Sequence, residues 1–184
     1  MKIATWNVNS IKMREDHILD WLEAHEPDVL CLQETKISDQ EFPEDGLLDL
    51  DYEVEYFGQR SYNGVAIASR APMSNVVRGF NNASDSDDKR LIAATIEGVR
   101  VVCIYLPNGQ AVGSDKYNFK LSWMEQLRAF LEEESSTEPL VLAGDYNIAP
   151  QVGDHFSAAP DDDHLFVSKP ELDRYRALLD WGLT

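Results

Sequence analysis

Hydrophobic and polar positions follow two different patterns along the chain. In some segments the apolar residues recur about every 3.6 residues, which predicts amphipathic helices. These segments run from Ile11 to His25, from Phe119 to Glu134 and from Pro170 onward. Ser10 stands directly before the first of them and is the expected N-cap residue. The predicted inner faces carry Ile11, Ile18, Leu19 and Leu22, then Leu121, Met124, Leu127, Phe130 and Leu131, then Leu172, Tyr175, Leu178 and Leu179.

Elsewhere the apolar residues form short runs that predict β-strands. Val29 to Glu34 and Pro139 to Asp145 are expected to be buried strands, because apolar residues occupy most of each run. Six further strands are predicted at Lys2 to Asn7, Tyr52 to Phe57, Gly64 to Ser69, Ser74 to Arg78, Arg90 to Glu97 and Arg100 to Leu106. Strand-helix-strand units at both ends, with a β-meander between them, place the chain in the α/β class.

The remaining segments do not divide the chain. Asn81 to Asp88 is polar and predicts an exposed loop, and Ala149 to Asp163 is irregular. No repeat, low-complexity tract or linker is present in the sequence, so we expect one domain over residues 1–184. No apolar run approaches the ~20 residues that span a bilayer, and the N-terminus lacks a secretory signal. A cytoplasmic location without a membrane partner is therefore expected.

Polar residues follow the ends of four predicted strands. These ends read WNVN at residues 6–9, QETK at 33–36, YLPNG at 105–109 and GDYN at 144–147. In α/β proteins functional groups gather at the carboxyl ends of strands, because a rigid backbone there lets side chains converge. If the four ends meet, they bring together two carboxylates, two or three amides and one phenol.

That set of groups suits a hard divalent cation and a phosphate ester. Mg²⁺ takes oxygen ligands and needs only one or two carboxylates besides substrate phosphate, so Glu34 and the amide oxygen of Asn7 are candidate ligands. Asp145 can activate or hold water for in-line attack. Asn147 and Tyr105 can hydrogen-bond the phosphoryl oxygens.

Each of these residues also has an ordinary structural interpretation. A single Asp or Asn after a strand is more often a turn former or a helix cap, and a tyrosine is more often a half-buried aromatic. The four strand ends together, rather than any one of them, favour a site. Cys31 and Cys103 lie in apolar runs without a Cys or His cluster, so they are expected in the core rather than at zinc.

The formal net charge of -17 bears on the expected substrate. Proteins that bind nucleic acid usually carry a basic footprint, so this charge taken alone argues against DNA. Acidic residues can instead cover a solvated outer face or contribute to a metal site. The charge therefore predicts that DNA binding depends on a divalent cation and on a locally basic or polar face.

Five segments resemble the exonuclease III and abasic-site endonuclease family. They are Trp6 to Ile11, Pro27 to Lys36, Tyr62 to Ala66, Tyr105 to Gly109 and Gly144 to Pro150, of which the second and fifth are quite specific. Their order and spacing agree with the family along the whole chain. The resemblance implies a four-layered α/β-sandwich of the DNase I-like type, in which two packed sheets lie between helices.

The resemblance also implies an activity. It is that of a DNA-repair phosphodiesterase, an exodeoxyribonuclease III with abasic-site endonuclease and 3′-end-cleaning activity. The implied cofactor is Mg²⁺ or Mn²⁺, and the implied substrate is double-stranded DNA with abasic sites or with blocked or recessed 3′ ends. Two alternatives stay open: another phosphodiesterase of the same superfamily, such as a lipid or inositol phosphatase or a nonspecific nuclease, and a catalytically impaired remnant that acts as a DNA-binding or assembly module.

The matched motifs imply a role for each candidate residue. Glu34 would bind the metal with support from Asn7, and Asp145 and Asn147 would be further metal ligands. Asp145 would also act on the nucleophilic water or the leaving group. Tyr105 would contact the scissile phosphate, which Asn147 would orient. Weaker candidates for substrate contact are Lys36 and Asn108.

The chain departs from the family at its C-terminal end. Family members continue beyond a segment like the one that ends at Leu183 into further strands, which carry an aromatic-rich DNA-contacting motif, another catalytic Asp and a terminal Asp-His pair. The Asp-His dipeptides of this chain, at residues 16–17, 154–155 and 163–164, lie in a predicted helix or in loops and do not fit that position. We therefore expect an incomplete second sheet and exposed loop histidines.

An incomplete second sheet has a consequence for folding, because it would leave the inner apolar face of the first sheet exposed. Three explanations are compatible with such a face. The chain is the recorded part of a longer protein, a second polypeptide supplies the rest, or a truncated and weakly active product associates with itself. The first is favoured, and it divides the site: the metal-and-phosphate half lies in this chain and the Asp-His half in the missing segment.

Overall fold

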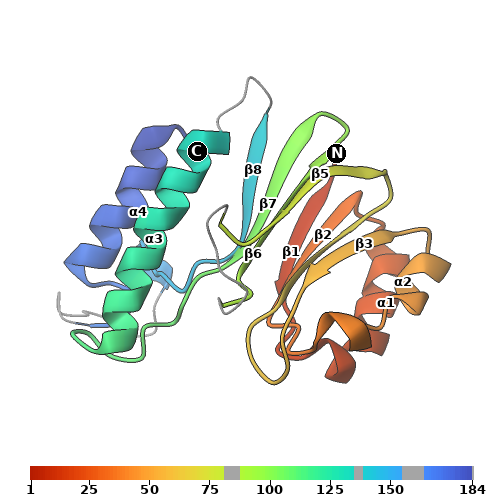
Figure 1. The fold of residues 1–184 in the computed structure, drawn as a ribbon, viewed down its shortest axis with the longest axis horizontal. Coiled ribbons are helices and arrows are strands. Elements are labelled where there is room, and N and C mark those ends of the chain that lie inside the picture. The colour runs from red at the N-terminus through yellow and green to blue at the C-terminus, as the bar shows by residue number, and fades with distance from the viewer. Residues whose placement is uncertain (81–87, 135–138, 155–163, 184) are drawn as a thin grey trace. The chain divides into compact units, whose positions relative to one another are not determined.

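The computed structural model describes residues 1–80, 88–134, 139–154 and 164–183 (Figure 1). The chain divides into two compact units. The first consists of Met1–Tyr105 and Ser136–Asp145, and the second of Leu106–Ser135 and Tyr146–Thr184. The chain therefore leaves the first unit directly after Tyr105 and again directly after Asp145. A single domain over residues 1–184 stays a prediction.

The first unit contains two four-stranded sheets. Their strands are β1 (Ile3–Asn7), β2 (Val29–Gln33), β3 (Glu53–Phe57), β4 (Val65–Ser69), β5 (Met73–Arg78), β6 (Leu91–Ile96), β7 (Val99–Tyr105) and β8 (Leu140–Asp145). The first sheet has the order β1-β2-β4-β3 and the second β5-β6-β7-β8. The pairs β1-β2 and β7-β8 are parallel, and all other neighbours are antiparallel. All eight predicted strands are confirmed, each to within one residue of its predicted limits. The burial predicted for residues 139–145 is wrong, because every residue of β8 is only half-buried.

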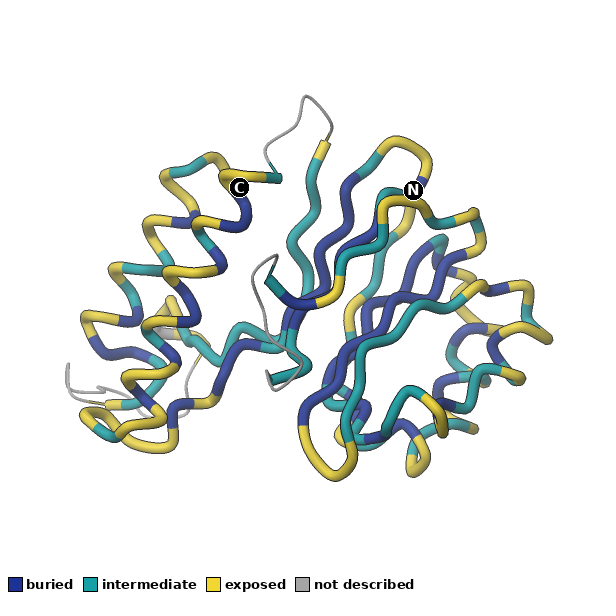
Figure 2. Tube along the Cα trace, viewed as in Figure 1, coloured by how far each residue is buried: buried dark blue, intermediate teal, exposed yellow. Residues whose placement is uncertain are grey.

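The core of the first unit lies between the two sheets. Every residue of β2 and β4 is buried, as Figure 2 shows. Cys31 and Ile67 of the first sheet belong to one hydrophobic cluster with Ile92 and Cys103 of the second, and none of these four has exposed surface. The prediction that both cysteines lie in the core is confirmed. The expectation of an exposed inner face is wrong for β2 and β4, which are buried throughout, whereas Thr5 on the edge strand β1 is exposed.

The opposite face of the first sheet packs against two helices. These are α1 (Glu15–His25) and the five-residue α2 (Asp45–Asp49). Leu22 of α1 and Leu47 of α2 join Leu32 of β2 in a second hydrophobic cluster. Removing a side chain of this kind from water contributes about 1.5–3 kcal/mol to stability. The first unit is thus layered as helices, sheet and sheet, which confirms the α/β class.

The start of the first helix differs from the prediction. Residues Ile11–Met13 form a separate 3₁₀ turn, η1, and α1 begins only at Glu15. Ser10 makes no side-chain cap. The backbone N–H groups of Ser10 and Ile11 donate instead to the carbonyls of residues 34 and 35, at 2.7 and 3.1 Å. The turn after β2 therefore holds this segment in place of helical hydrogen bonds. The short α2 was not predicted, since five residues do not reveal a helical period.

Two long helices dominate the second unit. They are α3 (Asp115–Glu134) and α4 (Lys169–Trp181), which pack against each other, and a short 3₁₀ turn, η3 (Val152–Asp154), precedes α4. α3 begins four residues before its predicted start at Phe119. At the start of α4, Ser168 and Glu171 form a capping box, which satisfies N–H groups that the helix itself leaves free. No helix in the described part of the chain is long and apolar enough to cross a membrane.

The predicted inner faces of α3 and α4 need correction. In α3, Met124, Leu127, Phe130 and Leu131 are buried as predicted, but Leu121 is only half-buried. In α4, Leu178 is buried and Leu179 is 39% exposed. Two charged residues, Lys120 and Glu171, are fully buried although charged side chains usually meet solvent. Both lie on the apolar stripe of their helix, since Lys120 precedes Met124 by four residues and Glu171 precedes Tyr175 by four. Their mutual ion pair explains how both charges can leave water.

Gly144 occupies a backbone position that a side chain would obstruct. It has a φ of +147°, and a Cβ built on it would lie 2.0 Å from the carbonyl oxygen of Ile104 on β7. Ile104 and Gly144 are register partners in the parallel pair, as are Tyr105 and Asp145. The glycine therefore permits the close approach of β8 to β7 that places Asp145 beside Tyr105.

Gly144→Ala is expected to destabilise the protein by about 3 kcal/mol, because backbone strain and steric overlap each contribute about 1–3 kcal/mol. For a chain of this size the melting temperature should fall by roughly 6–12 °C, measured by circular dichroism. Gly98→Ala is the matched control, since Gly98 also has a positive φ but nothing lies within 4 Å of the point that its Cβ would occupy. Equal losses of stability in the two variants would contradict a role for close strand packing at Gly144.

Candidate active site

Four strands of the first unit end at one cluster of polar side chains. Asn7 is the last residue of β1, Glu34 directly follows β2, and Tyr105 and Asp145 are the last residues of β7 and β8. Within each parallel pair the carboxyl ends lie at the same edge of the sheet. A hydrogen bond from Asn7 to Asp145 joins the end of the first sheet to the end of the second. The four predicted strand ends therefore meet.

Asn7 holds the two carboxylates together. Its amide nitrogen donates to Glu34 Oε1 at 2.7 Å and to Asp145 Oδ2 at 2.8 Å. Its Oδ1 accepts the backbone N–H of Asn9 at 3.1 Å. The nitrogen, rather than the predicted oxygen, thus faces the carboxylates, so Asn7 orients both acids in this arrangement. Two carboxylates within hydrogen-bonding distance of one atom form a concentrated negative site.

Glu34 is held in place by its backbone as well as by its side chain. Its φ is +55°, a left-handed conformation that is strained for a residue other than glycine. Its carbonyl accepts the N–H of Ser10 at 2.7 Å, and the next two residues donate to the carbonyls of Gly64 and Asn63. These bonds to separate segments fix the turn that aims Glu34 at the cluster.

The charge state of Glu34 is set by its neighbours. Burial alone would raise the pKa of this carboxyl group, but hydrogen bonds from Lys36, Asn7 and Tyr105 and the positive charge of Lys36 outweigh burial. The pKa of Glu34 consequently lies below its usual value of 4.5. Lys36 Nζ lies 2.8 Å from Glu34 Oε2 and also contacts Asn9. Glu34 is therefore an anion at neutral pH, and the ammonium group of Lys36 lies beside it.

Tyr105 supplies a neutral hydrogen-bond donor beside Glu34. Burial, reinforced by the negative charge of Glu34, raises the pKa of Tyr105 to about 12. The phenol is therefore protonated throughout the physiological range. A positive charge lies against its ring, because the guanidinium carbon of Arg90 is 4.6 Å from the ring centroid.

Arg90 and its partners are site neighbours that the sequence did not predict. Arg90 Nη1 donates to the Tyr105 carbonyl at 3.3 Å, and Nε donates to Asp88 Oδ2 at 3.0 Å. The other oxygen of Asp88 accepts the side-chain amide of Asn63, also at 3.0 Å. These contacts connect the Tyr62 to Ala66 motif to Tyr105. Arg90 is the first residue of a predicted strand. The pattern of polar residues that follow strands therefore did not identify it.

The two remaining predicted residues lie in the second unit and contact each other. Asn147 donates from Nδ2 to the Leu106 carbonyl at 2.8 Å, and Asn108 Nδ2 donates to Asn147 Oδ1 at 3.4 Å. Asn147 has a φ of +46°. In the chain, Asn108 follows Tyr105 by three residues, and Asn147 follows Asp145 by two. The turns after β7 and β8 are thus tied to one another through these amides.

The donor set of the first unit fits a hard divalent cation. Glu34 and Asp145 supply carboxylate oxygens, and Mg²⁺ needs only one or two of these. In the described ranges, no group of three or more His, Cys, Asp or Glu residues is arranged to hold a metal ion. A cation here would therefore complete its coordination with water and substrate oxygens, which is the usual pattern for Mg²⁺.

The Asp-His dipeptides do not join the cluster in the part of the chain that is described. Residues 16 and 17 are exposed on α1. His164 is exposed, and its ring contacts the Leu165 carbonyl at 3.0 Å. His155 and Asp163 lie outside the described residues. The prediction of an exposed loop histidine is confirmed for His164.

Comparisons with known proteins agree with this geometry. An exodeoxyribonuclease of Bacillus subtilis is 30% identical over 99% of this chain. An AP endonuclease from Archaeoglobus fulgidus is 36% identical, and a 3′ phosphatase from Neisseria bound to a product DNA hairpin is 39% identical. Both solved structures give a TM-score of 0.94 and match 100% of this chain and 72% of their own.

The matched relatives are longer than this chain. It spans 72% of the Bacillus subtilis protein and 61% and 58% of two other curated relatives. The profile of the Endonuclease/Exonuclease/phosphatase family matches residues 4–184, nearly the whole sequence. The chain therefore belongs to the endonuclease/exonuclease/phosphatase family, and its resemblance to the exonuclease III and abasic-site endonuclease members is confirmed.

Proposed function

We propose that this chain carries the metal-and-phosphate half of a DNA-repair phosphodiesterase, with exodeoxyribonuclease III, abasic-site endonuclease and 3′-end-cleaning activity. The observation that carries the proposal is the double hydrogen bond of Asn7, which brings Glu34 and Asp145 to one point at the ends of four strands. The similarity to an exodeoxyribonuclease, an AP endonuclease and a DNA-bound 3′ phosphatase supports DNA as the substrate.

Mg²⁺ or Mn²⁺ is the proposed cofactor, with Glu34 as its main protein ligand. Asp145 and Asn147 are proposed as further ligands, and Asn7 holds the two carboxylates in position. When bound, the cation polarises a phosphoryl oxygen and neutralises charge that develops in the transition state. The ionised state of Glu34 at neutral pH favours cation binding.

The chain's own side chains perform the remaining proposed steps. Asp145 accepts a hydrogen bond from the attacking water and orients it for in-line displacement. Tyr105, which stays protonated, donates a hydrogen bond to an oxygen of the scissile phosphate. Asn147 orients the same phosphate. Lys36 and Asn108 are proposed as further substrate contacts.

The proposed partner is double-stranded DNA with an abasic site or a blocked or recessed 3′ end. A chain of net charge -17 repels DNA at long range, so contact depends on the cation and on local basic groups. Lys36 and Arg90 supply two such groups beside Glu34 and Tyr105. A C-terminal segment or a second chain would supply the rest of the active site, and the whole would act in the cytoplasm.

A panel of substrates tests the proposed function. The purified chain, together with the segment or second chain that completes the active site, is incubated with Mg²⁺ and a duplex that carries an abasic-site analogue, an undamaged duplex, duplexes with recessed or 3′-phosphate ends, and a soluble inositol phosphate. We expect cleavage at the abasic site and reaction at the 3′ ends, both abolished by EDTA. Phosphate release from the inositol ester alone would contradict DNA as substrate. Metal-independent DNA binding without cleavage would favour a non-catalytic remnant, an alternative that is compatible with the shorter length of the chain.

A further inference from the structure

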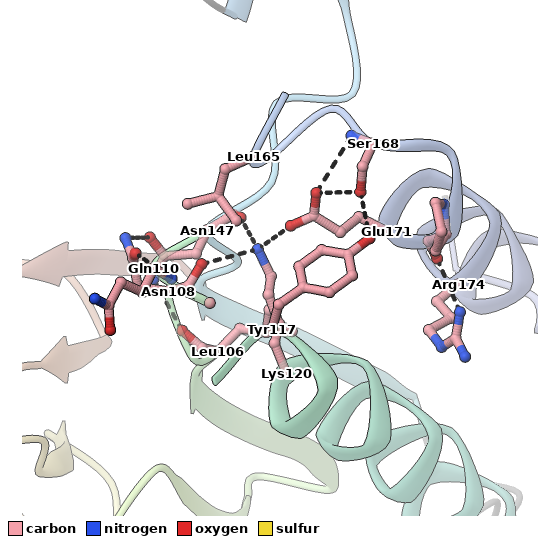
Figure 3. A network of polar contacts seen from close by, with 12 residues as sticks. Leu106, Asn108, Gln110, Tyr117, Lys120, Asn147, Leu165, Ser168, Glu171 and Arg174 are labelled. Atoms are coloured by element: carbon pink, nitrogen blue, oxygen red, sulfur yellow. Dashed lines mark hydrogen bonds and ion pairs between the residues drawn. The ribbon is translucent and has the colours of Figure 1, made fainter. Parts of the chain in front are cut away.

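A lysine is completely buried at the centre of the second unit. Lys120 lies in the first half of α3 and has no exposed surface. Its ammonium group has three acceptors: Glu171 Oε1 at 2.5 Å, the Asn147 carbonyl at 2.6 Å and the Asn108 carbonyl at 3.4 Å. Three acceptors match the three N–H donors of an ammonium group. Figure 3 shows the nitrogen at the point where these groups converge.

Two of the three acceptors belong to the turns that carry predicted site residues. The carbonyls of Asn108 and Asn147 are main-chain groups, so Lys120 fixes the backbone of both turns rather than a flexible side chain. The side chain of Asn147 donates a hydrogen bond to the Leu106 carbonyl and accepts one from the side chain of Asn108. The Asn147 carbonyl is thus held by Lys120 of α3, while its side chain bonds groups of the turn after β7.

Glu171 connects this ammonium group to the start of α4. Its Oε1 faces Lys120, while its Oε2 accepts from the hydroxyl and the backbone N–H of Ser168, at 2.6 and 3.2 Å. The Ser168 hydroxyl in turn lies 2.7 Å from that of Tyr117, one helical turn before Lys120. One carboxylate therefore caps α4 and balances the buried lysine. Such a pair is fixed in position, because a shift would leave a charge without a partner in the interior.

The turn at Gly109 is shaped to admit the lysine side chain. Gly109 has a φ of +93°, and a Cβ built on it would lie 3.1 Å from Lys120 Cδ and 3.1 Å from Leu165 Cδ1. A side chain there would press against the aliphatic part of Lys120. The glycine of the YLPNG segment therefore leaves room for the lysine that holds the preceding Asn108 carbonyl.

We infer that Lys120 is a positioning residue, which sets the backbone of Asn108 and Asn147 and thereby aims the Asn147 side chain for the reaction. The inference rests on the proposed function, in which Asn147 orients the scissile phosphate. Lys120 is buried and does not itself touch substrate. A displacement of about 1 Å in an orienting group lowers turnover by up to roughly 100-fold, so a contact to the backbone of that group matters for rate.

The test variant is Lys120→Met with Glu171→Gln. Removing both charges of a buried pair preserves stability far better than removing one. Gln at position 171 can still complete the capping box with Ser168. The double variant should keep a melting temperature near that of the wild type. Its kcat on an abasic-site duplex should fall by roughly 10–100-fold while KM changes little.

Glu171→Gln alone separates positioning from stability. This variant loses the ion pair but keeps the contacts of Lys120 with both carbonyls, so its melting temperature should fall while its kcat stays near the wild-type value. Arg174→Met with Glu125→Gln is the matched control. Arg174 and Glu125 also join α4 to α3, with Arg174 Nε 3.1 Å from Glu125 Oε1, but they are partly exposed and this contact lies away from both turns. The kcat of this control variant should be unchanged.

Hydrogen exchange measured by mass spectrometry provides a readout that does not depend on activity. In the double variant of Lys120 and Glu171, amides of residues 106–110 and 146–149 should exchange about tenfold faster, with the strands unchanged. Unchanged exchange in these turns, or a kcat that follows the melting temperature across all variants, would overturn the inference. If the wild-type protein with its completed active site does not cleave DNA, the proposed function fails, and the exchange measurement alone decides whether Lys120 fixes the turns.

Discussion

Asp145→Asn is expected to lower kcat for cleavage of an abasic-site duplex by roughly 10²–10⁴-fold, the range associated with loss of a general acid or base. Asparagine has nearly the same shape as aspartate, and its amide oxygen can still accept the hydrogen bond from Asn7. The substitution therefore removes the negative charge and the proton-accepting group while leaving the packing of β8 unchanged. The expected signature is a large fall in kcat without a fall in melting temperature.

The control for this substitution is Asp49→Asn, at an exposed position at the end of α2. Both changes remove one negative charge from the first unit, so they alter its long-range field equally. The steady-state rate on the same duplex should then fall in Asp145→Asn by the full factor given above and stay near the wild-type rate in Asp49→Asn. Similar activity in the two variants would show that Asp145 has no special role in the reaction.

Glu34→Gln should raise the Mg²⁺ concentration required for half-maximal activity by at least about 10–100-fold, because perturbing the groups around a metal site already costs that much affinity. The change removes the proposed carboxylate ligand and leaves Lys36 without its anionic partner at 2.8 Å. Saturating Mg²⁺ should restore part of the activity, which distinguishes a metal ligand from a group needed in the chemical step. A magnesium titration of cleavage rate measures the shift.

The same titration with Glu41→Gln provides the comparison. Glu41 is exposed and pairs with Arg60, so its loss removes an equal charge away from the cluster. An equal shift in both variants would contradict metal binding at Glu34.

The Mg²⁺ concentration required for half-maximal activity of the wild type should change little through protonation of Glu34 between pH 5.5 and 8. The reason is that the pKa of Glu34 is depressed below 4.5, so protons compete with the cation only below that value.

The sequence was sufficient to predict the strand ends that make up the cluster. Buried strands appear as short apolar runs, and a polar residue that follows such a run lies at the edge of a sheet. Asn7, Glu34, Tyr105 and Asp145 were all found in this way, and the structure brings them together. The orientation of Asn7 was not predictable, because composition and spacing do not reveal which end of an amide faces a carboxylate.

The supporting contacts were not predictable from the pattern. Lys120 and Glu171 are charged residues on the apolar stripes of their helices, and they are 51 residues apart. Only the packing of α3 against α4 brings them together. Arg90 likewise acts through the carbonyl and the ring of Tyr105 and through Asp88, so its role depends on tertiary contacts. These residues lack the strand-end signal because none of them lies at the carboxyl end of a strand.

We propose that Asn7, Glu34 and Asp145 form one cation-dependent site for phosphodiester hydrolysis. This site is tested by the rate at which the wild-type protein, with the segment or second chain that completes its active site, cleaves an abasic-site duplex during a titration with Mg²⁺, compared with the same reaction in EDTA. We expect a rate that saturates with Mg²⁺, disappears in EDTA and falls sharply in Asp145→Asn. Cleavage that continues in EDTA, or that Asp145→Asn leaves unchanged, would contradict it.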